Sequence, residues 1–75
     1  MFTSKGGEVV ADCQASGAYL LSWSPLQGYE IDDVVRGPAP AARVTFESNG
    51  GDVTMVVTCS GGVPSATTSS RPGDD

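Results

Sequence analysis

The chain has 75 residues, two cysteines, no histidine and a net charge of −5. A chain of this length forms a single domain whose small core needs a cross-link to be comfortably stable. The acidic excess and the lack of a basic stripe argue against nucleic acid and against docking on an anionic membrane surface. No apolar run approaches the roughly 20 residues that span a bilayer, so we expect no membrane insertion by this segment.

The first predicted strand covers residues 8–13, where apolar and acidic side chains alternate as in a half-buried strand. Its apolar face consists of Val9, Ala11 and Cys13. A turn then leads to a second strand over 18–24, which ends before Pro25 because proline cannot donate to a ladder. One face of this strand carries Tyr19, Leu21 and Trp23, and the other carries Ala18, Leu20 and Ser22. The sequence leaves open which of the two faces is inward.

The third predicted strand covers residues 29–36, and its alternation breaks at Asp32 and Asp33. A β-bulge at these aspartates would restore the register. Residues 42–47 and 53–59 alternate most clearly, and the Asn49-Gly50 turn between them predicts a hairpin. The apolar face of this hairpin consists of Ala42, Val44, Phe46, Val53, Met55, Val57 and Cys59.

The pattern predicts a disordered N-terminus over 1–5, a domain over 6–62 and a flexible tail over 63–75. The tail is rich in Ser, Thr, Pro and Gly and has little apolar surface to order it. No stretch carries helical periodicity, which disfavours a small α+β domain. We therefore expect an all-β fold, a small five-stranded antiparallel β-sandwich that is immunoglobulin-like in the broad sense.

The two cysteines are predicted to form one disulfide, because each ends a strand-like run in phase with the apolar face. The bond between Cys13 and Cys59 would tie the first and last predicted strands and place the chain in an oxidising compartment. The alternative is a pair of buried free thiols in the cytosol. Two cysteines without histidine cannot complete a zinc site, so neither a metal nor a cofactor is expected.

Catalytic groups are scarce. Without histidine there is no Ser-His or Cys-His couple, and the serines lie in turns or at strand ends. The acidic residues Glu30, Asp32 and Asp33 could form a carboxylate pair or bind calcium, but a solvated strand edge explains them better. We expect no enzymatic activity, and a hydrolase using these carboxylates remains a third hypothesis.

Two features are candidate contact surfaces. Trp23 is expected to pack in the core with Phe46, in an echo of the immunoglobulin tryptophan that packs on the disulfide. Alternatively, Trp23 lies exposed beside Tyr19 or Tyr29 as a recognition platform. The loop over 36–41 is stiff and apolar, and a partner could bind it. The candidate interaction residues are Tyr29, Arg36, Gly37, Pro38, Ala39 and Pro40.

The order of four segments resembles the C-terminal extracytoplasmic domain of small, uncharacterised actinobacterial secreted or single-pass membrane proteins. The segments are GGEVVADC at 6–13, SPLQGY at 24–29, RGP at 36–38 and VTMVVTC at 53–59. The resemblance covers residues 6 to about 62. It implies a β-sandwich with a disulfide and an N-terminal membrane helix outside this sequence, and it transfers no catalytic residues.

These observations predict a non-catalytic extracytoplasmic binding or protein-interaction module, secreted or membrane-anchored. Its partner would be another protein or a cell-envelope component, engaged through a strand edge or the 36–41 loop. No signal peptide is visible in the first residues, so we expect the export signal or anchor to lie outside this sequence. The alternative is a secreted protease inhibitor that presents residues 36–41 as a substrate-like loop.

Overall fold

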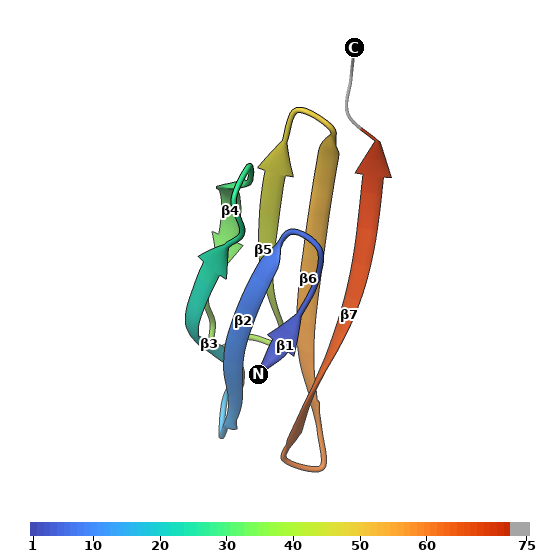
Figure 1. Ribbon diagram of the computed structural model, residues 1–75. Coiled ribbons are helices and arrows are strands. Elements are labelled where there is room, and N and C mark those ends of the chain that lie inside the picture. The colour runs from blue at the N-terminus through green and yellow to red at the C-terminus, as the bar shows by residue number, and fades with distance from the viewer. Residues whose placement is uncertain (73–75) are drawn as a thin grey trace.

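Two antiparallel β-sheets pack face to face in the computed structural model, which describes residues 1–72 (Figure 1). Sheet A has the strand order β1, β2, β3, and sheet B has the order β4, β5, β6, β7. The strands are β1 (Phe2–Thr3), β2 (Gly7–Gln14), β3 (Gly17–Pro25), β4 (Glu30–Val35), β5 (Ala41–Ser48), β6 (Gly51–Ser60) and β7 (Val63–Pro72). Residues 1–72 contain no helix that could cross a membrane. The fold is all-β and sandwich-like, as the sequence predicts, but the expected number of five strands is wrong.

The core lies between β2 and β3 on one side and β5 and β6 on the other. Its fully buried side chains are all apolar: Val9, Ala18, Leu20, Ala42, Val44, Phe46, Val53, Met55 and Val57. Phe46 reaches across to sheet A, where a Cβ atom on Gly7 would collide with its ring. Trp23 is half-buried and packs against the edge of this cluster.

The β5–β6 hairpin confirms the clearest sequence prediction. Ser48 pairs with Gly51 across the Asn49-Gly50 turn, and the register continues without a shift to Ala41 opposite Thr58. Inward residues of the two strands therefore face one another in pairs, which buries them together. This hairpin forms the centre of sheet B.

A bulge in β3 settles which residues of that strand face inward. Val10 pairs with Ser22 and Ala11 pairs with Leu20, so Leu21 has no partner on β2. One extra residue moves every following side chain to the opposite face. Leu20 is therefore fully buried, Leu21 is 45% exposed, and the inward face resumes at Trp23. Neither of the two faces expected from strict alternation is inward along the whole strand.

Both ends of the domain contain a strand that the sequence analysis left out. The N-terminus was expected to be disordered, but Phe2 pairs with Val9 and packs against the core. The predicted tail is β7 over 63–72, which pairs with β6 along its whole length. Only Pro64 and Ala66 of this segment are partly buried, so it is ordered by backbone hydrogen bonds to β6 and not by burial of its side chains. The last three residues of the predicted tail lie outside the described residues.

The predicted disulfide between Cys13 and Cys59 is present and joins the two sheets. It links β2 to β6, with 5.9 Å between the Cα atoms and 46 positions of sequence separation. Since β1 precedes β2 and β7 follows β6, the bond does not tie the first strand to the last. Both cysteines are half-buried at the margin of the core. A disulfide of this kind is typical of an oxidising, extracytoplasmic environment.

Candidate functional site

The loop over 36–41 joins β4 to β5 in sheet B, yet its backbone pairs with β3 in sheet A. The Leu20 amide donates to the Arg36 carbonyl oxygen at 2.8 Å. Ala18 and Ala39 exchange two hydrogen bonds, of 2.8 and 3.0 Å. The loop therefore covers the open edge of β3, which would otherwise present unpaired backbone groups.

Two glycines allow this close approach. Gly17 and Gly37 have φ values of 131° and 90°, which side chains of L-residues rarely adopt. A Cβ atom on Gly17 would also collide with the carbonyl group of Ala39, and one on Gly37 would collide with the carbonyl oxygen of Ala18. The loop and β3 can lie this close only because both positions lack a side chain.

Arg36 is exposed but held in place from three sides. Its Nε donates to the Leu20 carbonyl oxygen at 2.9 Å. Its guanidinium carbon lies 4.8 Å from the centre of the Tyr19 ring and 5.7 Å from that of Trp23. Both distances are within the range of cation–π attraction. Pro38 and Pro40 are exposed on the same loop. We call these five residues the Arg36 surface: Tyr19, Trp23, Arg36, Pro38 and Pro40.

Trp23 is neither fully buried in the core nor fully exposed, so its position lies between the two predicted alternatives. It packs against the core on one side and lies beside Arg36 on the other. It is not the counterpart of the immunoglobulin tryptophan, because it pairs with Val9, four positions along β2 from Cys13. That spacing corresponds to about 13 Å along a strand. The residue opposite Cys13 is Ala18.

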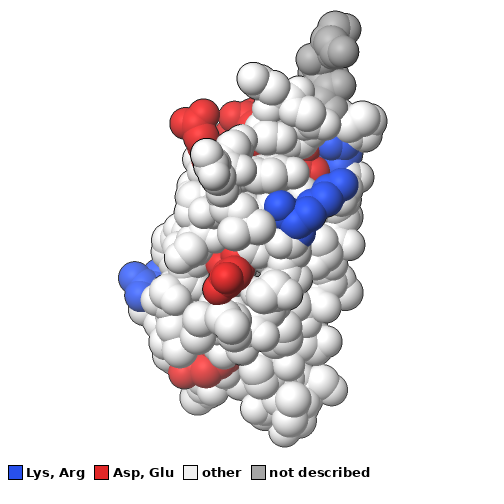
Figure 2. Space-filling view, viewed as in Figure 1, with Lys and Arg blue, Asp and Glu red and all other residues white. Residues whose placement is uncertain are grey.

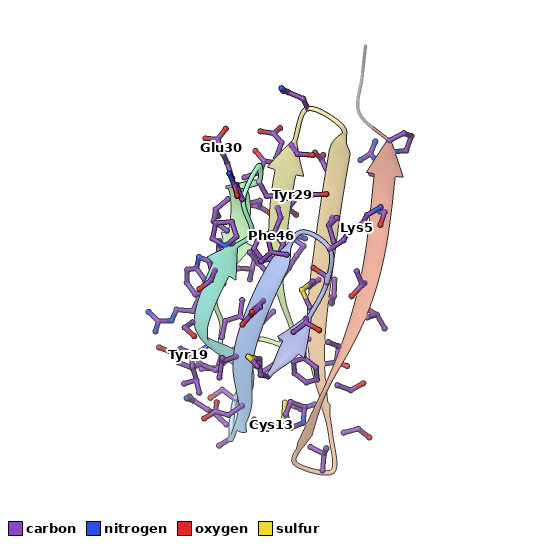
Figure 3. All side chains as sticks on the ribbon, in the orientation of Figure 1. Lys5, Cys13, Tyr19, Tyr29, Glu30 and Phe46 are labelled. Atoms are coloured by element: carbon purple, nitrogen blue, oxygen red, sulfur yellow. A yellow bond between two sulfur atoms is a disulfide. The ribbon has the colours of Figure 1, made fainter. Side chains whose placement is uncertain are left out.

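Tyr29 does not belong to the Arg36 surface. It is half-buried and packs against the core, and its amide donates to the Leu26 carbonyl oxygen at 3.0 Å. Figure 3 shows Tyr29 beside Glu30 and Phe46 toward the upper end of the molecule, whereas Tyr19 lies toward the lower end. The structure therefore separates Tyr29 from the loop with which the sequence analysis grouped it.

Among the acidic residues of β4, Asp33 is engaged by a neighbouring strand. The predicted bulge is confirmed, since the β4 register shifts between Ile31 and Asp33. Asp33 accepts hydrogen bonds from Nε and Nη2 of Arg43, at 3.1 and 2.8 Å. Within residues 1–72, no three His, Cys, Asp or Glu side chains are grouped closely enough to hold a metal ion.

A polar hollow of about 510 Å³ lies at the end of sheet B, near the β5–β6 turn. Its walls are formed by Gly28, Glu30, Glu47, Ser48, Asn49, Asp52, Arg71 and Pro72. Four of these form one row across the sheet, in which Glu30 pairs with Glu47, Glu47 with Asp52, and Asp52 with Arg71. The sequence analysis named only Glu30, because finding the row requires the registers of three strand pairs.

No protein-family model, no curated protein and no solved structure matches this chain. The resemblance to actinobacterial extracytoplasmic domains therefore stays a prediction.

Proposed function

We propose that this chain is a non-catalytic module that binds another protein outside the cytoplasm through the Arg36 surface. It would act as a secreted domain or as the outer domain of a membrane-anchored protein, immunoglobulin-like in the broad sense and similar to the actinobacterial domains. The observation that carries the proposal is an exposed arginine held against two aromatic rings. Arg, Trp and Tyr are the residue types that contribute most binding energy at protein interfaces.

The arrangement of Arg36 lowers the cost of binding. Its side chain is already fixed by the hydrogen bond to Leu20 and by the rings of Tyr19 and Trp23. Ordering a free side chain at an interface costs about 0.5–1.5 kcal/mol, and a fixed one avoids much of that cost.

The remaining donors of Arg36 define the chemistry of the partner. The salt bridge within residues 1–72 joins Arg43 to Asp33, and no carboxylate of this part of the chain pairs with Arg36. A guanidinium has five N–H donors, so several stay free to meet carboxylate or main-chain carbonyl oxygens. We therefore expect a protein segment that brings such oxygens to Arg36 and an apolar side chain to Pro38.

Photo-crosslinking tests this proposal. A benzophenone amino acid at Pro40 should capture a protein from the envelope fraction of the cells that encode this chain. The matched control is the same probe at Leu26, which is 44% exposed in the β3–β4 loop. Arg36→Lys keeps the charge but loses the planar stacking and should reduce capture at least about tenfold. Arg71→Lys, on β7, should leave capture unchanged.

Equal capture from Pro40 and Leu26, or capture unaffected by Arg36→Lys, would contradict the proposal. A thermal melt of each variant checks that the domain remains folded. Capture of a glycan or lipid instead of a protein would replace the proposed partner with an envelope component.

The geometry gives less support to the protease-inhibitor alternative. A protease binds a substrate-like loop in extended form, through its main-chain groups. In this loop, both main-chain groups of Ala39 already bond to Ala18. Incubation with a panel of serine proteases remains the direct test of this alternative.

A further inference from the structure

The outer edge of β7 is the longest open sheet edge among the described residues. β7 runs for ten residues at the end of sheet B, and β6 is its only neighbour in the sheet. The other edges are each modified. β1 has two residues and leaves only the short edge of β2 over residues 10–14 open, β3 is covered by the 36–41 loop at Ala18 and Leu20, and β4 is bulged and acidic. Short strands, covering loops, bulges and charges are the usual means of preventing pairing between sheets.

The β6–β7 turn fixes which backbone groups of β7 point away from the sheet. Gly61 and Gly62 have φ values of 59° and 81°, as in a two-residue type I′ turn closed by Ser60 and Val63. The closing pair of such a turn is hydrogen-bonded, and bonded and non-bonded pairs then alternate along the ladder. The residues whose N–H and C=O groups point to the open edge are Pro64, Ala66, Thr68, Ser70 and Pro72.

Two prolines agree with this assignment. Pro64 and Pro72 both fall at positions where an N–H group would point away from β6, and proline has none. They stand four residues on either side of Thr68. Between them, the edge offers the complete backbone groups of Ala66, Thr68 and Ser70.

We propose that a second copy of this chain occupies this edge, with the two β7 strands antiparallel about a two-fold axis at Thr68. Thr68 then lies opposite Thr68 of the second copy, and Ala66 lies opposite Ser70. Each pair exchanges two backbone hydrogen bonds, which gives about six in all. Pro64 faces Pro72 at both ends, so the missing donors fall together where the pairing stops. The two four-stranded sheets become one continuous sheet.

The side chains and charges of β7 suit this partner. Cross-strand neighbours in the pairing are small hydroxyl residues, such as Thr67 and Ser69, which fit side by side. Arg71 lies opposite Ser65 of the second copy and not opposite the other Arg71. Within 63–72 there is no acidic residue, and on the β7 side of Figure 2 basic residues gather in the upper part while the lower part is uncharged. An approach along the β4 edge would instead bring together Glu30, Asp32 and Asp33 of both copies.

The test is amide hydrogen exchange, measured by NMR at low and at high protein concentration. In the separate chain, the amides of Ser65, Thr67 and Ser69 bond to β6, while those of Ala66, Thr68 and Ser70 are open. We expect exchange of the second set to slow at least about fivefold with rising concentration, and that of the first set to change little. Sedimentation should show a dimer over the same range. Added salt should strengthen it, because two chains of net charge −5 repel each other.

Thr68→Pro removes the central donor of the open edge without removing a bond to β6. It should abolish the concentration-dependent protection and the dimer. Thr68→Val, which keeps the backbone donor, is the matched control and should retain both. A chain that stays monomeric at millimolar concentration would overturn the proposal. A dimer whose protected amides lie on another strand, or one that survives Thr68→Pro, would overturn it equally.

The outcome is independent of the proposed function. The Arg36 surface lies on the β3 edge and its loop, whereas this pairing uses β7 alone. Loss of dimerisation with intact capture from Pro40, or the reverse, would separate the two proposals.

Discussion

Glu47 is an exposed acidic residue of β5 whose cross-strand neighbours on both sides are also acidic. It stands between Glu30 on β4 and Asp52 on β6, in direct register with both. Like charges directly opposite each other destabilise a sheet. Arg71 lies at the far end of the row, opposite Asp52, and therefore does not neutralise Glu47 directly.

Neutralising Glu47 should stabilise the protein. Glu47→Gln removes both repulsive pairs and should raise the free energy of unfolding by about 0.5–1 kcal/mol in low salt. The gain should shrink as salt screens the charges. Urea denaturation at two ionic strengths measures both effects.

Glu8→Gln is the matched control, since Glu8 pairs with Thr3 and Ser24 and faces no acid. Equal gains for the two variants would show that the acidic row has no special effect. Such a result would attribute the gain to the net charge of the whole chain.

At the scale of the elements, β7 shows how a strand can form without an apolar pattern. Its composition is that of a flexible linker, and most of its side chains are exposed. The rule that links low apolar content to disorder considers only the burial of side chains. Without β7, the backbone groups on the outer side of β6 would be unpaired. The Gly61-Gly62 turn returns the chain so that β7 pairs with them. Hydrogen bonds along the ladder thus order a segment that buries little apolar surface.

A pair of proline substitutions tests the ordering of β7. Thr67 lies at a position whose amide bonds to β6, so Thr67→Pro should lower the free energy of unfolding by about 1–3 kcal/mol. Thr68→Pro, one residue further, should cost much less because that amide faces the open edge. Thermal or urea unfolding of the monomeric proteins at low concentration measures the difference. If both variants matched the parent, β7 would contribute nothing to stability.

The sequence predicted the elements whose side chains alternate cleanly and missed those that depend on other contacts. The β5–β6 hairpin, the bulge on β4 and the pairing of Cys13 with Cys59 follow from local pattern. The bulge at Leu21 leaves no sign in the sequence, because Leu20 and Leu21 are both apolar and either could face the core. The position of Arg36 against Tyr19 depends on a loop crossing from one sheet to the other, and no local rule predicts that crossing.

At the scale of the whole molecule, stability should depend strongly on the disulfide. Removing it with Cys13→Ala and Cys59→Ala should lower the free energy of unfolding by about 4 kcal/mol on the chain-entropy account. Small domains have only about 5–15 kcal/mol in total, so the variant should be close to unfolding at physiological temperature. Urea denaturation measures the loss.

Ser60→Ala, a change of similar size next to Cys59, is the control and should have little effect. A loss below about 1 kcal/mol in the double variant would mean that the two sheets hold together without the bond. Two free thiols in the native parent protein would contradict both the cross-link and the oxidising compartment that it indicates.

The position of the disulfide also determines how the molecule withstands proteolysis. Any single cut between Cys13 and Cys59 leaves two pieces that are still covalently joined. Arg36 and Arg43, the two basic residues of this stretch, have exposed side chains and both lie inside the closed loop. A nicked molecule would stay in one covalent piece until a reductant separated the halves. Even cuts after both arginines would release only residues 37–43 and leave the two outer pieces joined, so complete separation requires reduction of the disulfide.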